Sequence, residues 1–345
     1  MEFSAQITNW YKKNKRDLPW RKTSDPYKIW LSEVILQQTQ VNQGLPYYER
    51  FVVAFPSVQA LAQSDENEVL KLWQGLGYYS RARNLHFAAK QVVSMGQFPK
   101  QYDTILSLKG VGEYTAAAIA SFAFDLPHAV VDGNVFRLLS RYFGIEKNIQ
   151  TSGGKKHFNE LAHSLLNKQN PAIHNQAIME FGSQMCKPVQ PHCTNCPLQQ
   201  DCYAFNHQKV SYFPVKNKKK NSTKVFHDYF FLEYNQYTFI QKRQNDGIWK
   251  NLYEFPLIEN TKQLSKDNIL KHPNLHVWLK EKKINVKSIK SYKHILSHRL
   301  IFARFWHLKC YEIIKHPSLK KVDMKDLDNY AVSRLTEKYL HDISI

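Results

Sequence analysis

The first two thirds of the chain carry apolar residues three and four positions apart, the spacing of a helix with one buried face. This pattern predicts a helical domain. In residues 27–40, for example, Tyr27, Trp30, Leu31, Val34 and Ile35 form one apolar stripe. The expected helices span 3–13, 27–40, 65–73, 102–108, 115–124, 135–142, 157–166 and 172–184.

Beyond about residue 225 the pattern changes to the alternation and aromatic content typical of strands. Strands are expected at 229–234, 238–242 and 300–311, with a turn at Asn235 and Gln236. Helices are expected at 268–282 and 332–340. The polar, lysine-rich run 216–224 is typical of an interdomain linker. We therefore predict a helical domain (1–214), a linker (215–225) and an α/β domain (226–345).

Length, charge and hydropathy narrow the class of protein. A chain of 345 residues suits two domains better than one, and its net charge of +19 predicts a polyanionic partner. Residues 215–345 hold 26 Lys+Arg against 13 Asp+Glu. A ribosomal or membrane-surface protein would fit this charge as well. No apolar run approaches a membrane span and the N-terminus lacks a signal-peptide core, so a cytoplasmic protein is expected.

A glycine-bracketed turn joins two of the predicted helices. The run Leu-Lys-Gly-Val-Gly at 108–112 would aim several backbone N–H groups outward, and such a nest binds anions. An ordinary helix connection is the alternative. Downstream, Asp132 lies in Asp-Gly-Asn at the start of a helix, where it would either cap that helix or face what the turn holds.

Four of the five cysteines lie within 17 residues, at 186–202. Cys186, Cys193, Cys196 and Cys202 have the spacing C-x6-C-x2-C-x5-C, which is not a core-packing pattern. Disulfides do not suit a cytoplasmic chain. Four thiolates would hold zinc or an iron–sulfur cluster, and the spacing by itself does not choose. Cys310 stands alone and is expected to be buried.

The turn at 108–112 and the Val-Asp-Gly-Asn run at 131–134 resemble the helix–hairpin–helix DNA glycosylase superfamily that includes endonuclease III. The resemblance implies that Gly110, Val111 and Gly112 hold a DNA phosphate. It also implies that Asp132 faces the sugar of an extruded nucleotide. Glycosylase–lyases of this superfamily carry a Schiff-base lysine where this chain has Tyr114. The branch without that lysine is the adenine DNA glycosylase (MutY) family.

The run Trp-Leu-Ser-Glu-Val-Ile-Leu-Gln-Gln-Thr-Gln at 30–40 resembles the segment that carries the catalytic glutamate of that family. Taken alone, Glu33 would be typical of a solvated surface. The resemblance implies instead that Glu33 is the general acid that protonates N7 of adenine. It further implies that Tyr114 and Asn134 orient the catalytic groups. Adenine would be contacted by Trp20, Arg21 and Gln176. The gap left by the flipped base would be occupied by Gln38 and Tyr78.

In the same family the cysteine spacing is that of a [4Fe–4S] cluster. The implied role is structural, holding a loop that contains Lys187 against DNA.

Residues 240–256, from Ile-Gln-Lys-Arg to Tyr-Glu-Phe-Pro, resemble the core of MutT-like (Nudix) domains. The carboxylate-rich hydrolase box is missing after Pro256, so this domain is expected to bind rather than hydrolyse. A Phe-Ser-His loop of this domain contacts the oxidised base in adenine glycosylases. Here Leu296 replaces the phenylalanine, while Ser297 and His298 keep the polar pair.

The expected fold class is α + α/β: a helix–hairpin–helix glycosylase domain with an iron–sulfur loop, then a MutT-like domain. The expected function is excision of adenine opposite 8-oxoguanine or guanine in double-stranded DNA, without strand cleavage. We expect a cytoplasmic, nucleoid-associated monomer. The alternative is an endonuclease III-like pyrimidine glycosylase/lyase, which would need a lysine at Tyr114. More distant are a non-catalytic DNA-binding protein, expected to lack Glu33 or Asp132, and a zinc-binding nucleic-acid module.

Overall fold

The computed structural model describes residues 2–217, 222–244, 247–280 and 282–344. The chain divides into two compact units. The helical unit combines Met1–Gln63 with Asn84–Lys218, and the sheet unit combines Ser64–Arg83 with Lys219–Ile345. No helix in the described ranges is long and apolar enough to cross a membrane.

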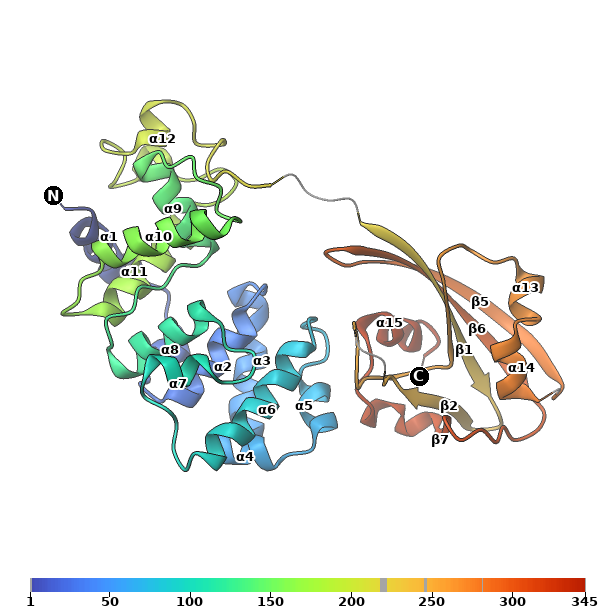
Figure 1. The fold of residues 1–345 in the computed structure, drawn as a ribbon. Coiled ribbons are helices and arrows are strands. Elements are labelled where there is room, and N and C mark those ends of the chain that lie inside the picture. Colours follow the sequence, from blue (N-terminus) through green and yellow to red (C-terminus); the bar gives the residue numbers. More distant parts are fainter. Residues whose placement is uncertain (1, 218–221, 245–246, 281, 345) are drawn as a thin grey trace. The chain divides into compact units, whose positions relative to one another are not determined.

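Except for the helix expected at 65–73, which folds with the sheet unit, the helical unit contains the helices expected from the apolar spacing and several more (Figure 1). They are α1 (Phe3–Asn14), α2 (Pro26–Leu36), α3 (Val41–Ala54), α4 (Val58–Gln63), α6 (Ser80–Ser94), α7 (Tyr102–Leu106), α8 (Glu113–Phe124), α9 (Gly133–Phe143), α10 (Ser152–Leu165), α11 (Pro171–Gln184) and α12 (Tyr203–Asn206). The first residues of α6 belong to the sheet unit.

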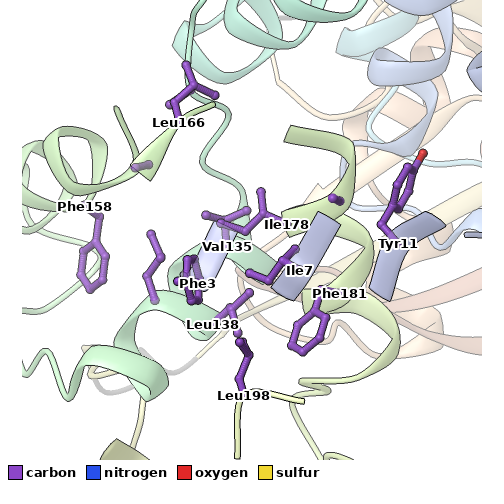
Figure 2. Close-up of a cluster of buried hydrophobic side chains, with 14 of the residues drawn as sticks. Phe3, Ile7, Tyr11, Val135, Leu138, Phe158, Leu166, Ile178, Phe181 and Leu198 are labelled. Atoms are coloured by element: carbon purple, nitrogen blue, oxygen red, sulfur yellow. The ribbon is translucent and has the colours of Figure 1, made fainter. Parts of the chain in front are cut away.

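One apolar core holds α1, α9, α10 and α11 together (Figure 2). Phe158 and Phe181 are completely buried in it, and Ile7 of α1 packs in the same cluster. Truncating a buried phenylalanine to alanine costs about 3–5 kcal/mol. This core therefore fixes the ends of α9 and α11 that carry Asp132 and Glu180.

Helix α8 is built from small residues because it packs closely on its neighbours. Ala116, Ala117, Ala118 and Ala120 are buried, and Ala117 and Ala118 pack with Val130 in a separate small cluster. Alanine combines the highest helix propensity with the least bulk. The result is that Tyr114, in the first turn of α8, reaches a residue of α2.

The sheet unit contains two sheets. The larger has the order β4–β1–β6–β5 and the smaller has the order β3–β2–β7. Strand β1 pairs in parallel with β6, and the other pairings are antiparallel. The strands are β1 (Thr223–Glu233), β2 (Tyr237–Lys242), β3 (Tyr253–Glu254), β4 (Leu257–Asn260), β5 (Ile284–Ile295), β6 (Arg299–Cys310) and β7 (Lys320–Asp323).

Helices cover both faces of the larger sheet (Figure 1). Helices α13 (Lys266–Leu270) and α14 (Pro273–Leu279) pack on the face that carries Phe230 and Trp306. Helix α15 (Arg334–Asp342) packs on the other face, where the Tyr339 ring stacks on Phe305 at 4.3 Å. Cys310 is buried, as expected.

Residues 64–83 fold with the sheet unit, although they lie early in the chain. They include α5 (Glu66–Leu72), whose N-cap is Asp65. The amide of Asn67 donates to Asn329 O and accepts from Ala331 N. The Tyr79 hydroxyl donates to Val332 O at 3.2 Å. These bonds fix the 75–80 loop, and with it Tyr78, to the second part of the chain.

Several expected boundaries were wrong. The helix expected at 268–282 is two short helices, because Pro273 cannot continue α13 and instead begins α14. Residues 27–40 are helical only to Leu36, and α10 begins at Ser152, five residues earlier than expected, because Thr151 caps it. Strand β5 was not anticipated. The expected linker overlaps β1, which begins at Thr223, and its residues 218–221 lie outside the described residues.

Candidate active site

Two carboxylates, Glu33 and Asp132, line a cavity of about 170 Å³ in the helical unit. We call it the carboxylate cavity. Tyr114 and Asn134 lie between them on the lining. The Tyr114 hydroxyl donates to Glu33 Oε2 at 2.7 Å, and Asn134 Nδ2 donates to Asp132 Oδ2 at 2.6 Å. The remaining lining residues are Arg16, Leu18, Trp20, Arg21, Ile29, Ser32, Leu36, Thr39, Val41, Phe122, Gln176, Met179, Glu180 and Ser183.

Glu33 is held at the cavity by a helix that is buried on nearly every side. Asp25 caps α2 by accepting from Tyr27 N, and Pro26 occupies its first position. Ile29 through Ile35 are all buried, and Glu33 itself is only 6% exposed. The sequence pattern alone favoured a solvated face for this residue. The structure instead buries it.

Asp132 is the N-cap of α9, and it also faces the cavity. Its Oδ1 accepts from the backbone N–H groups of Asn134 and Val135 at 2.9 and 2.8 Å. Arg137 Nη2 in turn donates to Asn134 Oδ1 at 2.9 Å. The two roles considered from the sequence are therefore compatible, because one oxygen caps the helix while the other lies toward Asn134 Nδ2.

Burial raises the pKa of Glu33 to about 7, although the Tyr114 hydrogen bond opposes the shift. The neighbouring Asp132 adds to it. At neutral pH, a carboxyl with this pKa is present in both protonated and ionised forms. Burial also raises the pKa of Asp132, opposed by the hydrogen bonds from Val135 and Asn134. Burial raises the pKa of Tyr114 well above its usual value, so its hydroxyl remains a donor.

A third carboxylate, Glu180, lies in the same cavity and was not found from the sequence. It is 1% exposed and accepts from Arg16 Nη2 at 2.6 Å and from Arg21 Nη2 at 2.8 Å. Burial would raise the pKa of Glu180, but hydrogen bonds from both arginines lower it to about 2. Glu180 is therefore ionised, in contrast to Glu33. No sequence signal links it to Arg16, because the two are 164 residues apart.

Of the residues expected to contact adenine, Trp20, Arg21 and Gln176 all line the carboxylate cavity. The Tyr11 hydroxyl donates to Gln176 Oε1 at 2.6 Å, which fixes the orientation of that amide. Gln38 does not line the cavity. It lies exposed in the turn after α2, with a left-handed φ of 58°.

The turn between α7 and α8 is tight and lies at the surface. Gly110 has a φ of 78°, and a Cβ there would meet Asn84 Cβ at 2.6 Å, so only glycine fits. Gly112 is the N-cap of α8 and makes no side-chain cap. Val111 is buried beneath the turn, while both glycines are exposed to solvent.

The four clustered cysteines line one cavity of their own, between α9, the end of α11 and the loop before α12. Arg141 Nη1 lies 3.4 Å from Cys186 Sγ, and Arg141 also donates to Lys187 O. Among the described residues, no three His, Cys, Asp or Glu side chains are grouped tightly enough for a single metal ion. The donor set is four thiols around a shared space with a cation beside it.

A second cavity, of about 450 Å³, lies within the sheet unit. We call it the loop cavity, because loops 75–80, 247–249 and 295–299 line it. Tyr78, Ser297 and His298, all expected near the oxidised base, lie on this lining. Tyr78 is about half exposed and has a φ of 47°. Ser297 Oγ lies 3.2 Å from His298 Nδ1.

Comparisons with known proteins match both parts of the chain. Residues 31–164 match the HhH-GPD superfamily of base excision DNA repair proteins, and residues 229–342 match the NUDIX domain. An endonuclease III–DNA complex has the same fold as 59% of this chain, with a TM-score of 0.53 at 20% identity. A thermostable thymine-DNA glycosylase is 30% identical, with a TM-score of 0.55, over 59% of this chain and 95% of its own.

Relatives with a known name agree with these matches. The adenine DNA glycosylase of Buchnera aphidicola subsp. Acyrthosiphon pisum (strain APS) is 35% identical over 305 residues, which are 87% of this chain and 84% of that protein. The adenine DNA glycosylase of Rattus norvegicus is 44% identical over 219 residues, 60% of this chain and 42% of its own. The chain therefore belongs to the adenine DNA glycosylase family and is a DNA N-glycosylase of base excision repair.

Proposed function

We propose that this enzyme hydrolyses the N-glycosidic bond of adenine mispaired with 8-oxoguanine or guanine, with Glu33 as the general acid and without cleaving the strand. The observation that carries the proposal is the buried Glu33, whose pKa of about 7 keeps a proton available near neutrality. An adenine base becomes a good leaving group only after it is protonated. The glycosidic bond is out of reach inside the duplex, so the nucleotide must first be extruded.

Asp132 is proposed to act on the sugar. As the base departs, positive charge develops on the sugar, and a nearby carboxylate stabilises it electrostatically or by transient covalent capture. Three hydrogen bonds, from Asn134 N, Val135 N and Asn134 Nδ2, favour the ionised form of Asp132. The pair would thus divide the work, with Glu33 donating a proton and Asp132 supplying negative charge.

The remaining lining groups are proposed to hold the base. Trp20 offers an apolar wall, and Gln176, oriented by Tyr11, offers an amide for the polar edge of adenine. Arg21 is bonded to the ionised Glu180, which is an acceptor suited to the exocyclic amino group.

Tyr114 supports a monofunctional reaction. A lyase of this superfamily needs an amine to form a Schiff base with the sugar. The side chain of Tyr114 is a phenol and has no amine. We propose that Tyr114 instead orients Glu33 and that the abasic strand stays intact.

The loop cavity is proposed to read the opposite base. It gathers Tyr78, Ser297 and His298 around a volume suited to a small ligand or a base. Ser297 and His298 supply polar atoms for a base edge. Tyr78 supplies a ring that can stack in the duplex, a role in which Gln38 would assist it.

The hairpin of Gly110, Val111 and Gly112 is proposed to hold a phosphate of the DNA.

A [4Fe–4S] cluster is proposed for Cys186, Cys193, Cys196 and Cys202. The fit rests on four thiols that share one cavity, with the Arg141 cation beside Cys186 to balance the charge of an anionic cluster. When bound, the cluster would cross-link the loop at 186–202 and so order Lys187 for contact with DNA.

We further propose a monomeric enzyme that acts in the cytoplasm at the nucleoid.

The test of the proposed chemistry is Glu33→Gln, which keeps the size of the side chain but removes the acid proton. Single-turnover release of adenine should fall by about 10²–10⁴-fold, the usual contribution of general acid catalysis. Binding to the duplex should persist. A rate within about tenfold of the parent enzyme would exclude Glu33 as the acid.

The cluster has its own test. Anaerobically purified protein should contain about four irons and absorb as a brown cluster, and replacing any of the four cysteines should weaken DNA binding. Stoichiometric zinc without iron would contradict the assignment.

A further inference from the structure

The loop cavity contains one buried polar group to which no role has yet been given, the indole of Trp249. Trp249 lies in the loop between β2 and β3. Its φ is +63°, and the φ of Asn251 is +67°. Left-handed backbone is unfavourable for a bulky residue, and it persists only where the surrounding contacts impose it.

Two sets of hydrogen bonds hold this loop in its left-handed conformation. Arg243 Nε donates to Ile248 O at 3.1 Å, and Asn251 N donates to Arg243 O at 2.8 Å. The Asn251 side chain donates to Glu66 Oε1 at 2.6 Å. The loop is therefore anchored both to the sheet and to the segment that carries Tyr78.

The indole of Trp249 is 8% exposed and packs beside His227 and His294, with ring centroids 6.3 and 5.7 Å away. Its Nε1–H has no acceptor among the described residues. Trp249 lines the loop cavity, so its indole is one of the side chains against which an occupant of that space would lie.

We propose that Trp249 Nε1–H donates a hydrogen bond to the C8 carbonyl of the oxidised guanine, an inference that rests on the proposed function of the loop cavity. 8-Oxoguanine differs from guanine in two places: C8 carries a carbonyl instead of a hydrogen, and N7 carries a proton. An indole N–H can only donate. Opposite guanine it would meet a C–H and remain unpaired, and unpaired polar groups in a buried site discriminate strongly.

This assignment leaves Ser297 and His298 to the other polar atoms of the base. It also gives this chain an aromatic group at the lesion although Leu296 stands where the family has phenylalanine.

The first experiment uses the full-length Trp249→Phe variant, which keeps an aromatic ring and removes the donor. Single-turnover adenine excision is compared opposite 8-oxoguanine, guanine and 8-methylguanine, whose methyl group fills the C8 position without an acceptor. The preference of the parent enzyme for 8-oxoguanine over both other bases should fall roughly 3- to 10-fold, as expected for loss of one hydrogen bond. Excision opposite guanine should not fall, because the N–H that Trp249→Phe removes has no partner there.

The preference of the parent enzyme tests the role of the loop cavity, and the variant tests the Trp249 contact. If it has no preference for 8-oxoguanine, the proposed function of the loop cavity fails and this inference fails with it. If the parent prefers 8-oxoguanine and Trp249→Phe keeps that preference within twofold, only the Trp249 assignment is wrong. An equal loss opposite all three bases would also overturn the assignment, since the contact would not be at C8.

A measurement on the parent enzyme does not depend on how the variant folds. With ¹⁵N-labelled tryptophan, one of the seven indole N–H signals should shift downfield on binding a duplex with 8-oxoguanine opposite a stable abasic analogue. The same signal should not shift with guanine in that place. Identical indole spectra for the two complexes would rule the hydrogen bond out.

Discussion

The carboxylate cavity and the loop cavity differ most in charge. The first is lined by three carboxylates, Glu33, Asp132 and Glu180. Among the described residues that line the second there is no carboxylate; its polar groups are hydroxyl, imidazole, indole and guanidinium side chains. Carboxylates are the groups needed to move a proton and to stabilise a cation. Hydrogen-bonding groups without negative charge suit the recognition of a base edge.

The contrast continues inside the carboxylate cavity. Glu33 and Glu180 are both almost fully buried, but one has a pKa near 7 and the other near 2. Burial raises both pKa values. The difference comes from the partners, because Glu33 receives one hydrogen bond from a phenol whereas Glu180 receives bonds from two arginines. A buried carboxylate is thus an acid or a fixed anion according to what faces it.

The comparison between the two cavities predicts that rate and specificity can be separated in this enzyme. Changes in the carboxylate cavity should affect excision opposite every base. Changes in the loop cavity should alter only the preference for the base opposite adenine.

After Glu33→Gln, the largest effect is expected for Asp132→Asn. Asparagine caps helices as well as aspartate, so the stability of α9 should stay within about 0.5 kcal/mol of the parent. The negative charge is lost, and excision should fall by about 10²–10³-fold, as for other electrostatic groups of active sites. Single-turnover rates and thermal unfolding measured together decide the role. If Asp132 were only a cap, the rate would remain near that of the parent.

An intermediate effect is expected for the double variant Ser297→Ala, His298→Ala. Removing two neutral hydrogen bonds, at about 0.5–1.5 kcal/mol each, should lower the preference for 8-oxoguanine over guanine roughly tenfold. Excision opposite guanine provides the internal control and should be unaltered. An equal drop opposite both bases would mean that these residues serve general DNA binding or stability.

The smallest effect, a shift in pH, is expected for Tyr114→Phe. The proposed reaction needs protonated Glu33, so excision by the parent should decline as pH rises through about 7. The Tyr114 hydroxyl stabilises the ionised form, and removing it should raise the pKa of Glu33 further. The declining limb should therefore move to higher pH, with a few-fold loss of rate below it. A limb that moves to lower pH would contradict the direction of this effect.

The sequence could predict whatever depends on local pattern. The apolar spacing located most helices of the helical unit. The segment around Glu33, the Asp-Gly-Asn run and the cysteine spacing pointed to residues that line the cavities described above. The runs around Glu33 and Asp132 were found by their resemblance to a known family and the cysteines by their spacing, whereas the apolar pattern alone would have left Glu33 on the surface.

Features made by distant residues could not be predicted in this way. Glu180 is ionised because the fold brings Arg16 and Arg21 to it across about 160 residues. Residues 64–83 join the sheet unit through backbone groups of 329–332, which carry no sequence signature. Strand β5 escaped notice because lysine and serine occupy many of its positions, and the helix at 268–282 was extended through Pro273.

One assay on the parent enzyme tests the proposed reaction, which is adenine release without strand cleavage. Duplexes with adenine opposite 8-oxoguanine, adenine opposite guanine, or an oxidised pyrimidine are incubated with excess enzyme, and the released base and strand breaks are measured separately. Under the proposed function, adenine release should be fastest opposite 8-oxoguanine, and the strands should break only after alkali. Release of the pyrimidine, or strand scission at the rate of base release, would contradict it.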